Sequence, residues 1–341
     1  VGRLVIGEQS EILIDRDLLR GAILPARSDR RKVAVFTQPG ARHIAEMVVE
    51  GVASVDVQQM ILPDRDTAKT LAVVQTAYEW LADMGMGRRD TIVGVGGGSV
   101  TDVAGFVAAT YLRGIEVVHV PTTLLGAVDA SIGGKTGVNL GGKNLVGSFH
   151  HPTRVLIDLD VLDRLPIELK REGMAEALKA ALIGDPALLV HLESTGLGAD
   201  LSVVVPRAVA VKVAVVDQDF RETGLRATLN YGHTIGHAVE ITAGMPHGHA
   251  VAVGMAAAGR IAEELVGFAN AGRQLKAIVG LGLPIATEGV ERRPVLDVLT
   301  RDKKRDASGM RMVLLRAIGE PVVLSVSGEA IDAGLASIGI T

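Results

Sequence analysis

The first half of the chain alternates short runs of β-branched residues with longer amphipathic stretches, and this alternation limits the possible folds more than any other feature. Strands are expected at residues 32–37, 57–62, 91–95, 116–120 and 154–159. Helices are expected between them, at about 40–50, 67–84 and 99–111. Strands and helices that alternate at this spacing build a parallel sheet with helices on both faces. The sequence therefore predicts an N-terminal α/β domain with a Rossmann-like parallel sheet.

The pattern changes after Pro166, where helices follow one another with hardly a strand among them. They are expected at 168–183, 201–220, 226–242, 249–266 and 271–279. A short β pattern at 310–315 and 321–325 precedes a last helix near 328–336. We therefore expect an α/β domain at 1–163 and a mainly α-helical domain at 164–341. Ligands tend to bind where domains meet, so we expect the active site in the cleft between them.

Composition excludes several classes of function. The net charge is −4 and both signs are interspersed, so there is no electrostatic footprint for nucleic acid or an anionic membrane. No apolar run reaches the ~18 residues of a membrane-spanning helix, and the first residues lack the pattern of a signal peptide. Cysteine is absent, which excludes disulfides and thiolate metal ligands and fits a cytoplasmic protein.

A glycine-rich turn at 93–102 connects an expected strand to an expected helix. Glycines let the backbone approach a phosphate, and the helix N-terminus offers free N–H groups. The Rossmann pattern G-x-G-x-x-G is absent, so a tight turn in a glycine-rich chain explains the run equally well. Asp102, inside the first turns of the helix, could equally be a surface acid favoured by the helix dipole.

Two glycine pairs, each followed by a lysine, lie in the segment 129–144. Lys135 and Lys143 could supply charge to a phosphorylated substrate while the glycines allow close approach. The alternative is two exposed loop lysines. The apolar segment that ends in Asp129 just before them favours the functional interpretation.

Three histidines lie within fifteen residues, His233, His237 and His247. On one helix Asn230, His233 and His237 would share a face, and Arg226 would extend it by one turn. Each unpaired polar group buried in an apolar protein costs ~1–3 kcal/mol. The helix face that carries these four polar side chains is therefore expected to face a metal, a charged substrate or both. Spacing alone favours His233 and His237 as an i, i+4 ligand pair.

Glu176 and Lys179 lie at i and i+3 on a helix face otherwise formed by Ala, Leu and Met. A surface ion pair is one interpretation. The apolar flanks favour partial burial, and Glu176 could then complete a zinc site with two histidines. A catalytic zinc keeps three protein ligands and one open position.

Six ordered blocks carry a resemblance that extends from about Lys69 to Leu315. They lie at 96–114, 120–149, 173–183, 221–240, 247–255 and 302–304. In these blocks the chain closely resembles the dehydroquinate synthase family, the sugar-phosphate cyclases. The resemblance implies an NAD-binding α/β domain and a helical metal- and substrate-binding domain with the metal site between them. It also implies a homodimer that uses NAD and zinc, or cobalt, which suits the same ligands.

The activity that the resemblance implies is conversion of 3-deoxy-D-arabino-heptulosonate 7-phosphate (DAHP) to 3-dehydroquinate and phosphate. NAD⁺ transiently oxidises a ring hydroxyl, phosphate leaves by β-elimination, and the ketone is reduced again. Ring opening and an intramolecular aldol step follow. Because NAD⁺ is regenerated, the net reaction is that of a lyase in the shikimate pathway of aromatic amino acid biosynthesis.

The resemblance also implies residue roles. The metal ligands become Glu176, His233 and His247, in place of the His233–His237 pair, and His237 becomes a proton-transfer group. Residues that would contact the substrate hydroxyls, carboxylate or phosphate are Asp129, Lys179, Lys212, Arg226, Lys135, Lys143, Asn144, Asn230, Lys304 and, from a second subunit, Arg113. Residues that would contact NAD are Asp66, Lys69, Gly97, Gly98, Asp102, Thr122 and Thr123.

The chain departs from the family pattern in four places. Arg65 and Asp66 stand where Gly-Glu is usual near the adenosine, Gln38 where Asp is often seen, and Arg164 where Thr is common. These changes could alter NAD binding. A fourth departure concerns the metal: His249 stands where Glu is usual in His-Gly-Glu-Ala-Val, so His249 is an alternative ligand, although the frame favours His247.

Three other functions compete. A related cyclase could act on sedoheptulose 7-phosphate, glucose 6-phosphate or an amino analogue of DAHP. The first two lack the carboxylate that Arg226 suits, whereas the analogue keeps every group. A metal-dependent alcohol or polyol dehydrogenase shares the architecture, but a neutral polyol would leave Lys135, Lys212 and Arg226 without a substrate partner. A non-catalytic NAD- and metal-binding relative is disfavoured because every expected catalytic position is filled.

Overall fold

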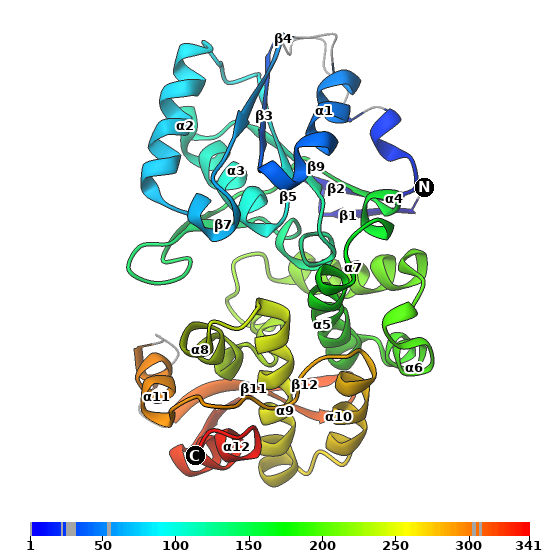
Figure 1. Ribbon diagram of the computed structural model, residues 1–341, viewed down its shortest axis with the longest axis vertical. Helices are drawn as coiled ribbons and strands as arrows, with labels where there is room; N and C mark the ends of the chain where they lie inside the picture. Colours follow the sequence, from blue (N-terminus) through cyan, green and yellow to red (C-terminus); the bar gives the residue numbers. More distant parts are fainter. Residues whose placement is uncertain (1, 22, 25–31, 53–55, 302–304, 307–308) are drawn as a thin grey trace. The chain divides into compact units, whose positions relative to one another are not determined.

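The computed structural model describes residues 2–21, 23–24, 32–52, 56–301, 305–306 and 309–341. The chain divides into two compact units, Val1–Pro166 and Ile167–Thr341. Figure 1 shows a sheet with flanking helices in the first unit and a mainly helical second unit. Of the helices that the described residues form, none is both long and apolar enough to cross a membrane.

The first unit is built on a seven-stranded sheet of order β1-β2-β9-β6-β5-β3-β4. The expected parallel sheet is confirmed. The strands expected from the sequence are β3 (Lys32–Thr37), β4 (Asp56–Ile61), β5 (Thr91–Gly96), β6 (Glu116–Pro121) and β9 (Arg154–Asp158), and each runs parallel to its neighbours. The antiparallel hairpin of β1 (Gly2–Ile6) and β2 (Ser10–Asp15) was not predicted from the sequence; its strand β2 pairs in parallel with β9.

Helices cover both faces of this sheet, so its strands are apolar on both sides. On one face Phe36 and Ile92 pack with residues of α2 (Leu71–Asp83) and α3 (Gly98–Thr110). On the other face Val35 and Val93 pack with α1 (Arg42–Gly51). The short helix α4 (Leu159–Asp163) follows β9. Helix α2 begins at Leu71, later than expected, because Arg65–Ala68 forms a separate 3₁₀ turn, η3, and Thr70 caps the helix.

The lysine-containing segment of the first unit forms a small hairpin of β7 (Lys135–Val138) and β8 (Val146–Phe149). Two glycines let these strands come together. A Cβ on Gly147 would lie 2.4 Å from the carbonyl oxygen of Thr136, and one on Gly137 would lie 2.8 Å from that of Val146. The glycines of this segment thus have a packing role as well as any role in binding.

The second unit has α5 (Ile167–Gly184), α6 (Pro186–Thr195), α7 (Leu201–Gln218), α8 (His233–Ala243), α9 (His247–Val266), α10 (Ala271–Gly280), α11 (Arg292–Arg301) and α12 (Gly328–Ser337). Strands β10 (Arg305–Asp306), β11 (Gly309–Ala317) and β12 (Glu320–Val326) form an antiparallel sheet. Helix α9, which is buried and apolar from Ala250 to Gly259, packs against α5, α8, α10, α12 and β11. It is the core element of this unit.

The expected single helix at 226–242 is wrong. Leu225–Asn230 forms a 3₁₀ helix, η7, and a separate α-helix begins at His233. Between them Gly232 has φ +77°, and a Cβ there would lie 2.5 Å from Cγ of Met255. Close packing on α9 therefore breaks the helix at a glycine, and Asn230 and His233 do not share a helix face.

Candidate active site

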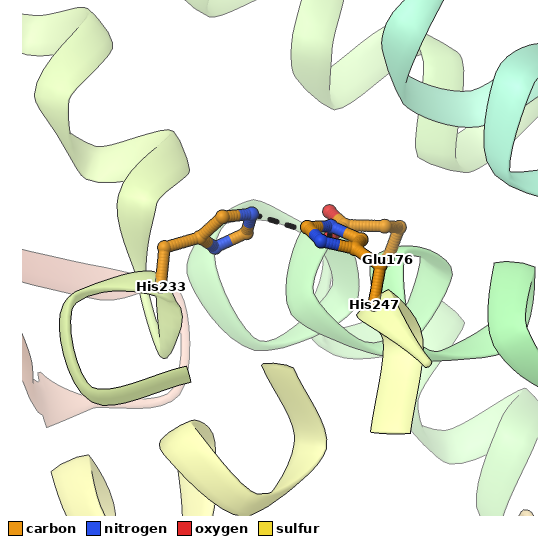
Figure 2. A group of neighbouring side chains, drawn as sticks. All are labelled: Glu176, His233 and His247. Atoms are coloured by element: carbon orange, nitrogen blue, oxygen red, sulfur yellow. Dashed lines mark hydrogen bonds and ion pairs between the residues drawn. The ribbon is translucent and has the colours of Figure 1, made fainter. Parts of the chain in front are cut away.

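Three side chains that are distant in sequence meet in the second unit. Glu176 projects from α5, and His233 and His247 are the first residues of α8 and α9. Oε1 of Glu176 lies 3.3 Å from Nε2 of His233 and 3.3 Å from Nε2 of His247 (Figure 2). Glu176 and His233 are buried, whereas His247 is partly exposed. One ligand atom from each of the three lies within 4.8 Å of the others.

Glycines at the helix contacts bring these ligand atoms together. A Cβ on Gly248 would lie 2.2 Å from the carbonyl oxygen of Glu172, so the first turn of α9 lies directly against α5. A Cβ on Gly254 would lie 1.9 Å from the carbonyl oxygen of Gly232. Helix α8 thus begins in contact with the middle of α9. The glycine that follows His247 is therefore required for helix packing as well as being part of the motif around the ligand.

Each histidine of the group is oriented through its second ring nitrogen. Nδ1 of His233 donates to the carbonyl oxygen of Tyr231 at 3.1 Å. Nδ1 of His247 donates to Oε2 of Glu240 at 3.3 Å. Such partners fix the ring so that Nε2 faces a metal. Glu240 was not predicted from the sequence, although it lies on α8 three residues after His237 and seven after His233.

The donor atoms of the group suit a divalent cation. Burial alone would raise the pKa of Glu176, but Lys179, His233 and His247 outweigh it and hold that pKa well below the ordinary value. Burial opposes protonation of His247, yet Glu176 and Glu240 raise its pKa to about 10. Burial lowers the pKa of His233. One carboxylate and two imidazoles form a donor set that fits zinc or cobalt.

The remaining histidines lie outside this group. The His237 ring lies 5.1 Å from that of His233 and 5.9 Å from that of His247, between ring centroids. His237 belongs to a second possible ligand group with Glu240 and His247. Among the described residues, His249 belongs to neither group. The geometry thus favours His247 over His249, and Glu176 with His233 and His247 over the i, i+4 pair.

Four other expected residues of the second unit lie in buried or partly buried positions. Lys179 forms an ion pair with Glu176, and Lys212 is a buried residue of α7. The Arg226 guanidinium is buried, donates to the carbonyl oxygen of Phe220 and lies 5.9 Å from the ring centroid of Phe220. Nδ2 of Asn230 donates to Oε1 of Glu222 at 2.6 Å, a partner that sequence analysis missed.

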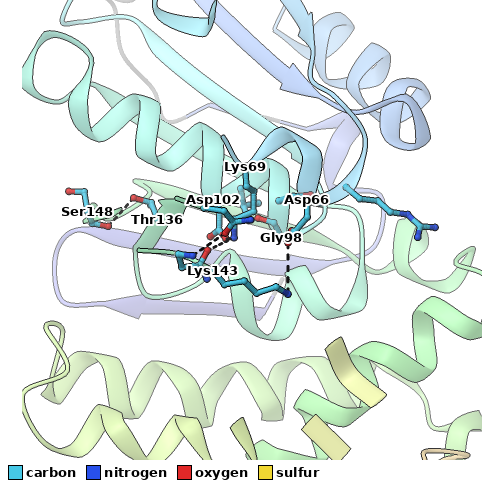
Figure 3. Close-up of polar contacts among 12 residues, drawn as sticks. Asp66, Lys69, Gly98, Asp102, Thr136, Lys143 and Ser148 are labelled. Atoms are coloured by element: carbon cyan, nitrogen blue, oxygen red, sulfur yellow. Dashed lines mark hydrogen bonds and ion pairs between the residues drawn. The ribbon is translucent and has the colours of Figure 1, made fainter. Parts of the chain in front are cut away.

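In the first unit the buried Lys69 connects a residue expected to contact NAD, Asp102, with one expected to contact the substrate, Asn144. The ammonium of Lys69 donates to Oδ2 of Asp102 and to Oδ1 of Asn144, each at 2.5 Å (Figure 3). Burial raises the pKa of Asp102, and Lys69 opposes the shift. Asp102 is only 17% exposed at its side chain. It is therefore part of a buried network and not an exposed acid at a helix terminus.

The glycine turn lies where β5 and β6 end. Gly97 packs on Thr123, and Thr122 N–H donates to the carbonyl oxygen of Gly96 at 2.9 Å. A Cβ on Gly96 would lie 2.4 Å from Cγ2 of Val100, so tight turn packing explains this glycine. No side chain caps α3, which begins at Gly98. The expected cofactor residues Gly97, Gly98, Thr122 and Thr123 are thus neighbours.

Gln38 has a defined role in the first unit. Its Nε2 donates to the carbonyl oxygens of Pro63 at 2.7 Å and Arg65 at 3.0 Å. A carboxylate at this position could not donate, so the amide of Gln38 is what holds the turn at Arg65, where φ is +49°. Exposed Asp66 lies 3.9 Å from the ammonium of Lys143 (Figure 3).

The other expected residues of the first unit lie on turns and at strand ends. Asp129 lies in the π-helical turn Gly126–Ala130. Exposed Lys135 begins β7. Exposed Arg113 has φ +68° at the end of the 3₁₀ turn η4 (Tyr111–Arg113), and Arg164 is exposed after α4. Lys304 lies outside the described residues.

Comparison with known proteins identifies the relatives of this chain. Residues 59–172 match the family described as 3-dehydroquinate synthase N-terminal, and residues 173–305 match 3-dehydroquinate synthase C-terminal. The 3-dehydroquinate synthase of Mycolicibacterium vanbaalenii is 44% identical over 306 residues, which are 86% of this chain and 85% of that protein. That of Mycobacterium leprae is 42% identical over 307 residues, 86% and 85% of the two chains.

Solved structures agree with this relationship. A 2-deoxy-scyllo-inosose synthase complexed with carbaglucose-6-phosphate, NAD⁺ and Co²⁺ has a TM-score of 0.91 at 26% identity, covering 98% of this chain and 99% of that one. The 2-epi-5-epi-valiolone synthase of Streptomyces hygroscopicus, with NAD⁺ and Zn²⁺ bound, has a TM-score of 0.87 at 28% identity, covering 96% of each chain. The NADH-dependent butanol dehydrogenase of Thermotoga maritima, at 15% identity and a TM-score of 0.68, shares the fold alone. By its matched domains and by these relatives, the chain belongs to the 3-dehydroquinate synthase family.

Proposed function

We propose that the protein is an NAD- and zinc- or cobalt-dependent 3-dehydroquinate synthase that converts DAHP to 3-dehydroquinate and phosphate. The observation that carries the proposal is the group of Glu176, His233 and His247 in a chain 40–44% identical to curated 3-dehydroquinate synthases. The related cyclases with NAD⁺ and Co²⁺ or Zn²⁺ bound support both cofactors.

The second unit would hold the metal and the reacting end of the substrate. When bound, the metal would lower the pKa of a ring hydroxyl, and NAD⁺ would accept a hydride from the carbon that bears this hydroxyl and later return it. Glu176, His233 and His247 would be the metal ligands. His237, beside this group and partly exposed, would accept the hydroxyl proton. The Lys179 ammonium, held by Glu176, would orient the hydroxyls together with Asp129.

Cationic and amide groups would bind the two anionic ends of DAHP. Arg226 offers a planar guanidinium suited to a carboxylate, with Lys212 as its companion. For the phosphate, Asn230 is held in place by Glu222 and Asn144 by Lys69. The other proposed phosphate and active-site contacts are Lys135, Lys143, Lys304 and Arg113. Neutralising the phosphate makes it a better leaving group.

NAD would bind to the first unit. Gly97 and Gly98 allow close approach of a pyrophosphate at the uncapped start of α3. Thr122 and Thr123 lie beside this turn, and the buried Lys69–Asp102 pair lies along the same helix. Asp66 would contact the adenosine side, on the turn that Gln38 anchors.

We also propose a homodimer in which Arg113 reaches the active site of the second subunit. Its exposed position at a turn with positive φ supports this arrangement. Mixing inactive Arg113→Ala protein with inactive His237→Ala protein would then restore part of the activity, because some mixed sites would be complete. No restoration would place Arg113 in its own subunit's site. The cytoplasmic location expected from the cysteine-free composition stays a prediction.

The test of the function is phosphate release from DAHP by purified protein with zinc and a catalytic amount of NAD⁺. Stoichiometric phosphate without accumulation of NADH, and 3-dehydroquinate as the product, are expected. Accumulating NADH would indicate a dehydrogenase, whose fold the chain shares at 14–15% identity. Release from the amino analogue or from sedoheptulose 7-phosphate, but not from DAHP, would assign the chain to another cyclase activity.

A further inference from the structure

A buried hydrogen-bonded chain runs from α10 to the residue that precedes α8 by two positions. Nε2 of Gln274 donates to the carbonyl oxygen of Met255 in α9 at 2.6 Å. Oε1 of the same amide accepts from the hydroxyl of Tyr231 at 2.6 Å. Gln274 and Tyr231 are both 0% exposed. One side-chain amide therefore connects the core helix α9 to the junction between η7 and α8.

The backbone of Tyr231 carries this connection to the metal group. Its carbonyl oxygen accepts from Nδ1 of His233. A carbonyl oxygen can only accept, so Nδ1 carries a proton, and Nε2, 3.3 Å from Oε1 of Glu176, is the nitrogen left to bind a metal. The direction of the Tyr231 carbonyl thus sets the ring angle of His233 and determines which nitrogen faces the metal.

Neighbouring glycines make room for this connection. A Cβ on Gly259 would lie 2.7 Å from Nε2 of Gln274, so a side chain there would displace the amide from α9. Gly232 follows Tyr231 with φ +77° and touches Met255, the residue whose carbonyl Gln274 binds. Two apolar side chains in place of Tyr231 and Gln274 could fill the same space without needing hydrogen-bond partners. The buried amide and hydroxyl instead need each other, because an unsatisfied buried polar group is strongly unfavourable.

We infer that Tyr231 and Gln274 are positioning residues for the metal ligand His233: their hydrogen bond fixes the peptide whose carbonyl orients the imidazole. This inference rests on the proposed function, because it takes His233 as a ligand. A role in packing alone would stabilise the second unit without changing metal affinity. A positioning role changes metal affinity and the hydrogen bond that Nδ1–H of His233 donates.

The experiment measures the zinc dissociation constant of the full-length protein by competition with a chelator. Tyr231→Phe removes only the hydroxyl, and Gln274→Leu tests the other end of the same bond. Loss of a partner of a metal-bound histidine weakens metal binding ~10–100-fold; we expect about 10-fold here, because the effect passes through the backbone. In the zinc-bound protein, ¹⁵N NMR should show a proton on Nδ1 of His233 and none on Nε2, and the Nδ1–H resonance should shift in both variants because its acceptor carbonyl has moved.

Two comparisons separate positioning from general destabilisation. Ser327→Ala removes the N-terminal cap of α12 in the same unit and should lower Tm with the zinc dissociation constant unchanged. The double variant Tyr231→Phe with Gln274→Leu removes both buried polar groups and should recover Tm, whereas zinc binding should stay about 10-fold weak. Recovery of zinc binding along with Tm would overturn the inference, as would single variants within twofold of the wild type. If His233→Ala also bound zinc normally, the proposed metal site itself would be wrong.

Discussion

At the scale of single residues, the site depends on partners to which the sequence assigned no role. Glu176, His233 and His247 are recognisable from the sequence, and the structure brings them together. Glu222 and Glu240 lie within the block 221–240 and Gln274 lies outside every block, but the sequence does not say which side chains these three residues hold. Gln274 lies 43 residues from Tyr231. Such pairs arise from tertiary packing, which a local pattern does not encode.

Glu240→Gln should weaken zinc binding about 10–100-fold, the usual effect of losing the carboxylate partner of a metal-bound histidine. The amide keeps the size of the side chain but removes the charge that faces Nδ1 of His247. The zinc dissociation constant measured by chelator competition checks the prediction. Glu264→Gln, at an exposed position of α9, is the matched control and should bind zinc like the wild type. Equal affinities of the two variants would show that Glu240 does not position His247.

Zinc uptake should release a proton. Two carboxylates raise the pKa of His247 to about 10 in the metal-free protein, so this ring is protonated at neutral pH. Zinc must displace that proton, and its affinity should rise as pH approaches about 10. Calorimetry in two buffers of different ionisation enthalpy counts the protons released. The variant His247→Phe removes both the titrating ring and the metal ligand. A calorimetric titration of the wild type whose heat does not depend on the buffer at pH 7 would contradict the prediction.

The same shift has a consequence for the stability of the metal-free protein. The folded pKa of His247 lies above the ordinary value of 6.5. Its contribution to the free energy of unfolding is therefore fully present below pH 6.5 and is lost as pH rises toward about 10. Unfolding by urea at a series of pH values should show this decline, and His247→Ala should remove it. A stability that rises over that window for the wild type alone would contradict the assignment of the proton to His247.

At the scale of helices and strands, periodicity predicted the type of most elements but not their breaks. The parallel strands and helices α5, α7, α9 and α10 follow the expected ranges closely. The helix expected at 226–242 fails at Gly232, because α9 approaches there too closely for a side chain. The β7–β8 hairpin was not predicted, because its glycines interrupt the alternation of apolar and polar residues that indicates a strand. In both places a tertiary contact overrides local preference.

Gly248→Ala tests how helix contact builds the metal group. The added Cβ would lie 2.2 Å from the carbonyl oxygen of Glu172, so α9 must move away from α5. That movement separates His247 from Glu176, and we expect zinc binding at least 10-fold weaker together with a lower Tm. Gly272→Ala is the matched control: its Cβ would meet nothing within 4 Å at an exposed position of α10. It should raise stability by about 0.5–1 kcal/mol through helix propensity and leave zinc binding unchanged.

At the scale of the whole molecule, the two compact units carry different expected functions. The proposed metal ligands all belong to Ile167–Thr341, and the proposed NAD contacts all belong to Val1–Pro166. Strand and helix alternation predicted the first unit as α/β, and the helical run predicted the second. The dehydrogenases at 14–15% identity share this fold, so architecture does not decide the reaction. The choice between lyase and dehydrogenase depends on the charged residues that the units present.

This division predicts where each ligand protects the protein from hydrogen exchange. A ligand that binds the folded state stabilises it by about 2.7 kcal/mol at ~100 times its Kd. Amides that exchange through global unfolding would be slowed in both units, so the informative amides are those that exchange by local opening. Among these, zinc should protect α5 and the first turns of α8 and α9, whereas NAD⁺ should protect the turn at 96–98 and residues 122–123.

The variant Glu176→Gln is the control. It should lose the protection by zinc and keep the protection by NAD⁺, because its first unit is unchanged. If NAD⁺ instead protected the second unit alone, the assignment of the cofactor to the first unit would fail, and the glycine turn would be a packing feature only.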